Sequence, residues 1–155
     1  MDELAKAKHY AISLLAVRSR SVKELEARLL KKHGKDVVAE TLAFLKQRRL
    51  LDDRKYAGEM VSSANEMSPK SVAFIKDKLL RKGVSGDVID RAIDGEGLND
   101  REIASRLASE RIKKLKGLPP ANIKSRLYSY LSGRGFDYEV IDEVLRDFKY
   151  DINER

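Results

Sequence analysis

The chain contains no cysteine and only three prolines among its 155 residues. Without cysteine it can form no disulfide bond and has no thiol chemistry. With so few prolines, long stretches are free to form helices, and helix-favouring residues such as leucine, alanine, lysine and glutamate are abundant. No apolar run approaches the roughly 18 residues of a membrane-spanning helix, and the charged start MDELAKAKHY is unlike a signal peptide. We therefore expect a cytoplasmic protein, built from helices and not associated with a membrane.

Histidine is also scarce, which argues against catalysis and metal binding. The chain has only His9 and His33, whereas histidine-based metal sites need three or four ligands and catalytic triads need a histidine beside a nucleophile. We expect His33 to interact with the carbonyl groups at a helix end. Asp52 and Asp53 are better explained as helix caps than as a catalytic carboxylate pair. The sequence predicts no enzyme activity, no cofactor and no metal site.

Basic residues outnumber acidic ones and are unevenly distributed. The 32 lysines and arginines against 25 aspartates and glutamates give a formal net charge of +7. Residues 18–35 and 110–134 are strongly basic, whereas residues 87–102 and 137–147 are mainly acidic. An excess of this kind favours an acidic partner, such as nucleic acid or an acidic protein groove. The alternative is a soluble protein with a basic isoelectric point, because runs of charge are often only solvated faces.

Apolar residues recur at helical spacing in three successive rounds. The first round predicts helices over about 4–17, from Ser21 onward, and over about 36–48. The stretch SVKE predicts a capping box between Ser21 and Glu24. Gly34 is expected to end the second helix in the left-handed conformation.

The second and third rounds open with the similar stretches LDDR (51–54) and LNDR (98–101). In the second round, SPKS predicts a helix over 70–82 that is capped by Ser68, with proline in its first turn. In the third round, the prolines of LPPAN (118–122) begin the corresponding helix.

The two later rounds share one register. After Gly83 and after Gly135, apolar residues fall at the same five offsets, whereas the first round matches more loosely. Three copies of a three-helix unit indicate an array. The predicted fold class is all-α, with three tandem three-helix repeats (1–50, 51–97 and 98–155) that form an elongated, curved molecule. A single nine-helix globule with coincidental spacing is the alternative.

The stretch YLSGRGF, which ends at Phe136, places an arginine between two glycines after an amphipathic segment. It follows no strand and lacks the lysine and hydroxyl residue of a phosphate-binding loop. We interpret it as a structural joint in which Gly135 lets the chain reverse. Phe136 then occupies the position that Val84 fills one repeat earlier, and Arg134 corresponds to Lys82.

One helix shows a candidate binding face. The predicted buried residues of helix 70–82 are Val72, Ile75, Leu79 and Leu80. Phe74, Lys78 and Arg81 then point to the opposite side. An outward aromatic side chain beside cations suits a protein groove or a nucleic acid, and packing of Phe74 against a neighbouring repeat is an equally good alternative.

The second helices of all three repeats are basic, so stacking in register would align them as one continuous basic ribbon. Such a ribbon could follow a phosphate backbone or an acidic groove. The candidate residues for binding a partner or DNA are Arg18, Arg20, Lys31, Lys32, Phe74, Lys78, Arg81, Arg111, Lys113, Lys114, Lys116, Lys124 and Arg126.

Three stretches, taken in order, resemble the RecX family of regulatory proteins, which act on the recombinase RecA. They are AISLLAVRSRSVKELEARL (11–29), LAFLKQRRLLDDRKYA (42–57) and YLSGRGFDYEVIDEVL (130–145). The resemblance covers nearly the whole chain. The first-repeat turn KKHGK departs from the basic-residue–glycine pattern of the other two repeats.

The resemblance implies a protein without catalysis of its own that binds RecA and lodges in the groove of the RecA–DNA filament. There it would inhibit the recombinase, ATPase and coprotease activities of RecA in DNA repair and the SOS response. Some family members also bind single- or double-stranded DNA directly, and we expect a monomer. The alternative is a helical DNA-binding protein like a transcription factor. The acidic or mixed third helices (36–48, 86–94 and 137–149) argue against it, because a recognition helix usually presents base-reading polar residues.

Overall fold

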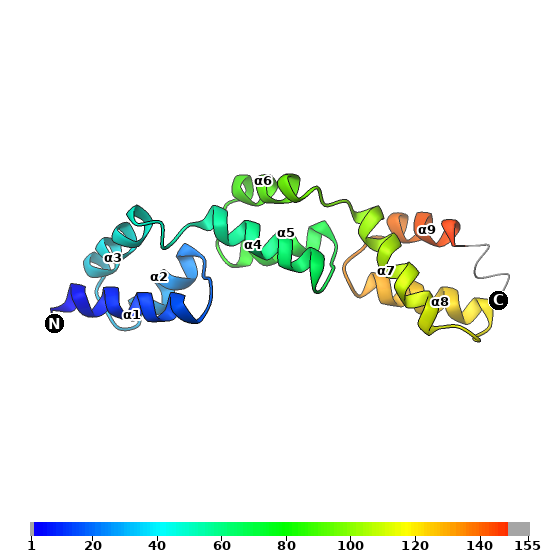
Figure 1. Cartoon of the computed structure of the whole chain (residues 1–155), viewed down its shortest axis with the longest axis horizontal. Helices are drawn as coiled ribbons and strands as arrows, with labels where there is room; N and C mark the ends of the chain where they lie inside the picture. The colour runs from blue at the N-terminus through cyan, green and yellow to red at the C-terminus, as the bar shows by residue number, and fades with distance from the viewer. Residues whose placement is uncertain (1, 149–155) are drawn as a thin grey trace. The chain divides into compact units, whose positions relative to one another are not determined.

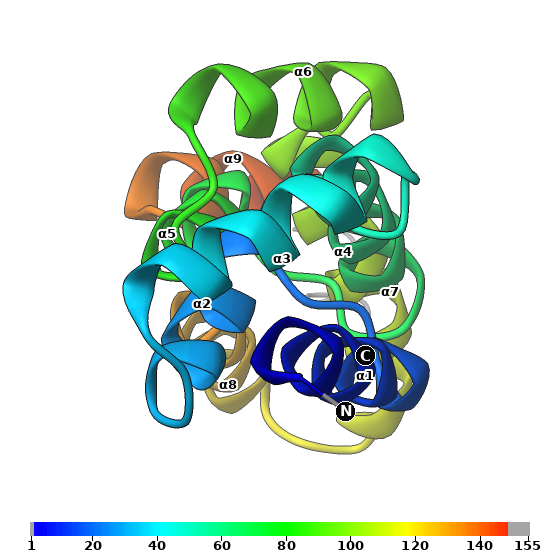
Figure 2. The same cartoon turned by 90° about the vertical axis from the view of Figure 1, so that its left-hand side faces the viewer.

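The computed structural model describes residues 2–148, and within them the only regular elements are α-helices. Figure 1 shows their order, and Figure 2 turns the molecule so that α1, α2 and α3 face the viewer. The helices are α1 (Glu3–Val17), α2 (Val22–Leu30), α3 (Lys35–Gln47), α4 (Asp53–Glu66), α5 (Val72–Arg81), α6 (Gly86–Glu96), α7 (Asp100–Lys114), α8 (Pro120–Ser132) and α9 (Tyr138–Asp147). The predicted all-helical class is confirmed for these residues.

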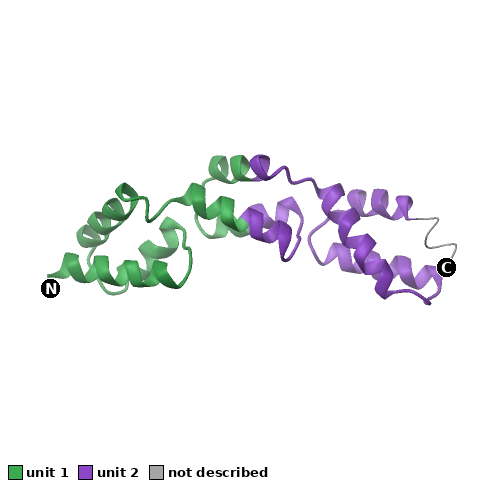
Figure 3. Cartoon of the chain, viewed as in Figure 1, with its two compact units in different colours: residues 1–60, 78–92 green, residues 61–77, 93–155 purple. Residues whose placement is uncertain are grey.

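The chain forms two compact units (Figure 3). Unit 1 consists of Met1–Met60 and Lys78–Ala92, and unit 2 of Val61–Asp77 and Ile93–Arg155. Helices α4, α5 and α6 each contribute residues to both units. The elongated, curved outline and the continuous basic ribbon stay predictions. Residues 149–155, at the end of the predicted third repeat and of helix 137–149, lie outside the described residues.

Within unit 1, helices α1, α2 and α3 pack around one apolar core. The buried residues of this core are Ala11, Leu25, Leu29, Val38, Leu42, Leu45 and Leu51. In α1 the buried residues are the two small alanines Ala7 and Ala11, and this helix packs mainly on α3. Burying these leucines and valines gives the first repeat a hydrophobic core of its own.

The start of α2 matches the prediction, but its end does not. The capping box between Ser21 and Glu24 is present. Gly34, however, has a φ of −71° and is the N-cap of α3. The chain leaves α2 through Lys31, which is still right-handed helical, so no left-handed residue is needed. The His33 N–H donates to the Leu29 carbonyl at the end of α2 at 2.9 Å, and its ring Nδ1 lies 3.1 Å from Glu3 Oε2.

Within unit 2, helices α7, α8 and α9 form a second bundle around thirteen buried residues. Leu131 and Phe136 belong to this core, and the Phe136 N–H donates to the Leu131 carbonyl at 3.3 Å. Between them, Gly135 has a φ of +90°, a left-handed conformation that favours glycine. The interpretation of YLSGRGF as a joint is therefore confirmed. Val84 is likewise buried after Gly83, which has a φ of +83°.

Helix α5 begins later than predicted. Its cap is Ser71 and not Ser68, because the Ser71 Oγ accepts the Phe74 N–H at 3.1 Å and the helix starts at Val72. Leu80, expected in the core, is 49% exposed, because it lies about 100° around the helix from the buried Leu79. Phe74 is 43% exposed, but it also borders the third repeat, because a Cβ atom at Gly135 would lie 3.2 Å from the Phe74 Cβ.

The end of α3 contains a strained residue. Arg49 has a φ of +59°, in the left-handed region that costs a residue with a side chain about 1 kcal/mol. We predict that Arg49→Gly raises the free energy of unfolding in urea by about 0.5–1 kcal/mol. The matched control is Gln47→Gly, two residues earlier, at the last residue of α3. This substitution should lower the free energy of unfolding by about 0.5–1 kcal/mol. Equal destabilisation by both substitutions would show that Arg49 is not strained.

Candidate binding residues and the joint between repeats

Within unit 1, two hydrogen bonds join the start of α2 to the second repeat. The Ser21 Oγ donates to the Lys82 carbonyl at 2.6 Å, and the Val22 N–H donates to Asp53 Oδ1 at 2.9 Å. The first N–H groups of a helix have no acceptor within that helix. Asp53 therefore caps a helix from another repeat, while Asp52 binds the Arg54 N–H in its own helix at 2.9 Å.

Within unit 2, the same joint links α5 to the third repeat. The Ser71 N–H donates to the Arg134 carbonyl at 3.1 Å, and the Val72 N–H donates to Asp100 Oδ1 at 2.7 Å. As in unit 1, the donors belong to a serine N-cap and the valine after it, although Ser21 donates through its hydroxyl and Ser71 through its backbone N–H. The acceptors are again an aspartate in the first turn of the next repeat and a carbonyl that precedes a left-handed glycine.

The two glycines of these joints leave room for the opposing repeat. A Cβ atom at Gly83 would lie 2.4 Å from Lys23 Cδ, and one at Gly135 would lie 2.6 Å from Ser71 Oγ. Both positions also have a positive φ. Glycine is thus required at each joint for its backbone conformation and for its lack of a side chain.

In the third repeat, prolines replace the donors of the joint. Pro119 is the N-cap of α8, and Pro120 follows it at the position of Val22 and Val72. Proline has no backbone N–H. Pro119 also has no hydroxyl, so the start of α8 has neither the serine donor nor the valine N–H of the two joints.

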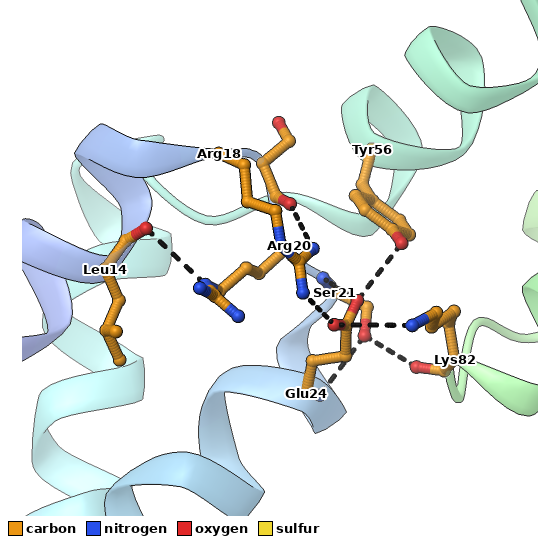
Figure 4. A network of polar contacts seen from close by, with 8 residues as sticks. Leu14, Arg18, Arg20, Ser21, Glu24, Tyr56 and Lys82 are labelled. Carbon is orange, nitrogen blue, oxygen red and sulfur yellow. Dashed lines mark hydrogen bonds and ion pairs between the residues drawn. The ribbon is translucent and has the colours of Figure 1, made fainter.

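The joint in unit 1 contains an additional polar network centred on the Glu24 carboxylate (Figure 4). Arg18 Nη2 donates to Glu24 Oε2 at 2.9 Å, and the Tyr56 hydroxyl donates to Oε1 at 3.0 Å. The Ser21 N–H lies 3.4 Å from Oε1, and Lys82 Nζ lies 3.7 Å from Oε2. Glu24 thereby connects α2 with α4 and with the turn after α5.

The network shifts the pKa of Glu24 and the pKa of Tyr56 in opposite directions. Partial burial alone would raise the pKa of the Glu24 carboxyl, but hydrogen bonds from Arg18, Tyr56 and Ser21, with the charge of Lys82, lower it overall. Burial and then the negative charge of Glu24 raise the pKa of Tyr56 to about 12. Glu24 is therefore ionised at neutral pH, and Tyr56 keeps the proton that it donates.

The second joint lacks this network. The position three residues after the serine cap holds Phe74 instead of Glu24, and the position of Tyr56 holds Ile103. Neither side chain can form a polar bond. The two joints thus share a backbone pattern, while the side chains around it are charged in one and apolar in the other.

Two of the candidate binding residues belong to the first joint. Arg18 is bonded to Glu24 and to the Ser19 carbonyl. Arg20 is 7% exposed, and its Nε donates to the Leu14 carbonyl at 3.4 Å. Burial, with the nearby charges of Arg18 and Arg28, lowers the pKa of Arg20. We conclude that Arg20 serves the fold and is not part of an exposed binding surface.

The other candidates in unit 1 are at the surface. Lys31, Lys32, Lys78 and Arg81 are exposed. The Lys32 ammonium lies 4.3 Å from the centre of the Tyr10 ring, an attractive cation–π distance. Their role in binding stays a prediction.

The candidates in unit 2 concentrate around the end of α7 and the start of α8. Lys113, Lys114, Lys116, Lys124 and Arg126 are exposed. Arg111 is half-buried, with its guanidinium carbon 4.9 Å from the centre of the Tyr130 ring. The cations in the last turn of α7 also interact favourably with the negative end of that helix. Phe74 lies elsewhere, in α5, with the Lys70 ammonium 5.1 Å from its ring.

Sequence reasoning identified Asp53 as a helix cap, but not that Asp53 and Asp100 cap helices of another repeat, nor that Ser71 and Lys82 take part in the joints. One signal was available, since Ser-Val precedes the second helix in both of the first two repeats. LDDR and LNDR likewise share an aspartate at their third position.

Three family models match the chain in order. They are the first three-helix domain of RecX at residues 7–45, the second at 52–93 and the third at 99–145. A curated relative, "Regulatory protein RecX" of Chlorobium limicola, is 33% identical over 88% of this chain and 85% of its own length. The chain belongs to the RecX family. Its fold is therefore that of three RecX three-helix domains.

Further relatives agree. "Regulatory protein RecX" of Chlorobaculum tepidum is 36% identical over 94% of this chain and 91% of its own length. The crystal structure of RecX from Lactobacillus salivarius superimposes with a TM-score of 0.78 at 23% identity, covering 95% of this chain and 97% of that one. The two curated relatives are named regulatory proteins, and the crystal structure supports the fold.

Two structural features are absent from residues 2–148. No helix in this part is long and apolar enough to cross a membrane. Nowhere in it do three or more histidine, aspartate or glutamate side chains gather as a metal site would require.

The joint glycine of the third repeat can be tested by adding a single methyl group. We predict that Gly135→Ala lowers the free energy of unfolding by about 2 kcal/mol or more, because φ is positive and Ser71 occupies the space. Gly95→Ala is the control, since nothing lies within 4 Å of its Cβ position in α6. It should raise stability by about 0.5–1 kcal/mol. Similar effects of both substitutions in urea denaturation would contradict the role of Gly135.

The charge of Glu24 can be tested with Glu24→Gln, which keeps the shape and the capping ability of the side chain. We predict a loss of about 1–3 kcal/mol of stability at pH 7. The folded-state pKa of Glu24 is lowered, so its contribution is present above the ordinary pKa of 4.5 and is lost as the pH falls through the folded value. The gap between wild type and variant should therefore close in acid. A gap that stays constant from pH 7 to pH 3 would refute this account.

Proposed function

We propose that this protein binds RecA and the RecA–DNA filament and inhibits the recombinase, ATPase and coprotease activities of RecA, in DNA repair and the SOS response. The observation that carries the proposal is the ordered match of all three RecX domains along the chain. The protein would act by binding, as a cytoplasmic monomer without catalysis or cofactor. The three repeats would extend over residues 1–50, 51–97 and 98–155.

In each unit, the residues that we propose for binding are the candidate cations that remain exposed, with Phe74 in addition in unit 2. Their most basic segment is 110–134, in which Glu110 is the single acidic residue. A basic surface suits both the acidic lining of a filament groove and DNA. Phe74 supports contact with a protein, because aromatic side chains are enriched at interfaces.

The proposal is tested by adding the protein to RecA on single-stranded DNA and following ATP hydrolysis. We expect inhibition at amounts well below the RecA concentration, because a protein lodged in a filament affects many protomers. The double variant Lys113→Glu and Lys114→Glu should inhibit on the order of tenfold less well. Lack of inhibition by the wild type would rule out the proposed function.

Matched charge reversals provide the control. Arg54→Glu and Lys55→Glu change the same total charge at two exposed residues of α4 in unit 1. This pair should leave inhibition within about twofold of wild type. Equal losses from both pairs would show that net charge, and not the segment 110–134, governs binding. Thermal melting of each variant separates loss of binding from loss of fold.

A further inference from the structure

Two arginines lie against the Tyr130 ring in the third repeat, and a third, Arg126, is on the same helix as Tyr130. Arg126 precedes Tyr130 by one turn of α8, so both side chains lie on the same flank of that helix. The guanidinium carbon of Arg134 lies 4.0 Å from the centre of the Tyr130 ring, and that of Arg111, from α7, lies 4.9 Å from it. Tyr130 itself packs against the core of the α7–α9 bundle. A ring anchored in the core therefore holds guanidinium groups from two elements.

These arginines have no acidic partner among residues 2–148. Elsewhere in the chain, Arg18 pairs with Glu24, and Arg101 pairs with Glu143 and Asp147. No ion pair within the described part of the chain involves Arg111, Arg126 or Arg134. In addition, the buried Nε–H of Arg134 has no acceptor there. Such an unpaired donor is costly, so the fold alone does not account for this arrangement.

The chemistry of the cluster favours phosphate. Guanidinium groups form paired hydrogen bonds with the oxygens of phosphate and are weakly hydrated compared with ammonium groups. The surrounding segment adds Lys113, Lys114 and Lys116, all exposed. A protein surface usually mixes both signs of charge, whereas a nucleic acid backbone presents only negative charge at regular intervals. The segment 110–134, with one acidic residue, is complementary to such a uniformly negative backbone.

We propose that Arg111 and Arg134, held against the Tyr130 ring, form with Arg126 one helical turn away a binding site for the phosphate backbone of nucleic acid. The inference rests on the proposed function, because it names the chemistry that one part of the binding surface recognises. Tyr130 is a positioning residue, because its ring orients the guanidinium groups, and these groups contact the phosphate.

The first test is the fluorescence anisotropy of a labelled oligothymidylate, titrated with the full chain at several salt concentrations. We expect Arg126→Gln and Arg134→Gln each to weaken binding about fivefold and to lower the log–log salt slope by about 0.7. Lys55→Gln removes the same charge from an exposed position of α4 that is outside the candidate binding residues, and should weaken binding by less than about twofold. Equal losses from Lys55→Gln and Arg126→Gln would overturn the site.

The positioning role of Tyr130 needs variants that change no charge. Tyr130→Phe keeps the ring and should bind the oligonucleotide as wild type does. Tyr130→Leu removes the ring and should weaken binding about threefold, although the net charge is the same. Unchanged binding by Tyr130→Leu would overturn the role of the ring. These two variants also decide the question if melting curves show that Arg134→Gln does not fold.

Two further measurements separate the alternatives. Polyglutamate at equal charge concentration should displace the oligonucleotide poorly, and efficient displacement would show that the site accepts protein carboxylates instead. The same variants are then assayed for inhibition of RecA. If the wild type binds DNA through these arginines but does not inhibit RecA, the phosphate-binding site is supported and the proposed function is wrong. RecA inhibition together with DNA binding that is independent of these arginines would remove the site alone.

Discussion

The repeats are joined by a carboxylate that accepts a backbone N–H from another repeat. Asp53 receives the Val22 N–H, and Asp100 receives the Val72 N–H, each at the partly buried positive end of a helix. A carboxylate is well suited to this position, because it satisfies a donor that the helix cannot and also interacts favourably with the helix dipole. The glycine turns and the buried valine and phenylalanine that follow them all support this contact.

A shared backbone pattern allows the side chains around it to differ. In the first joint, the Glu24 carboxylate accepts three hydrogen bonds and forms an ion pair with Lys82. The stability of this joint therefore depends on charge and on pH. In the second joint, Phe74 and Ile103 occupy the equivalent positions, and pH has no direct effect on them. Because proline replaces both donors at Pro119 and Pro120, the pattern ends with the third repeat. The same contact between repeats is thus formed twice and cannot form at the start of α8.

Part of the basic character of this RecX-family protein serves its own structure. Arg18 and Lys82 bind Glu24, Arg20 is buried, and Lys8 and Arg48 lie against the Phe44 ring. The cations of segment 110–134 differ, because described carboxylates pair with none of them. Net charge alone therefore overstates the surface available to a partner, and local pairing identifies the part of it that remains.

Local features of the fold were predictable from the sequence. The capping box of Ser21 and Glu24 spans three residues, and the reversal at Gly135 depends on one backbone angle. The tertiary structure alone decided that Asp53 caps a helix 31 residues away, that Asp100 does so across 28 residues, and that Arg20 is buried. A cap within a helix follows from residue spacing, whereas a cap between repeats exists only once packing has brought two distant helices together.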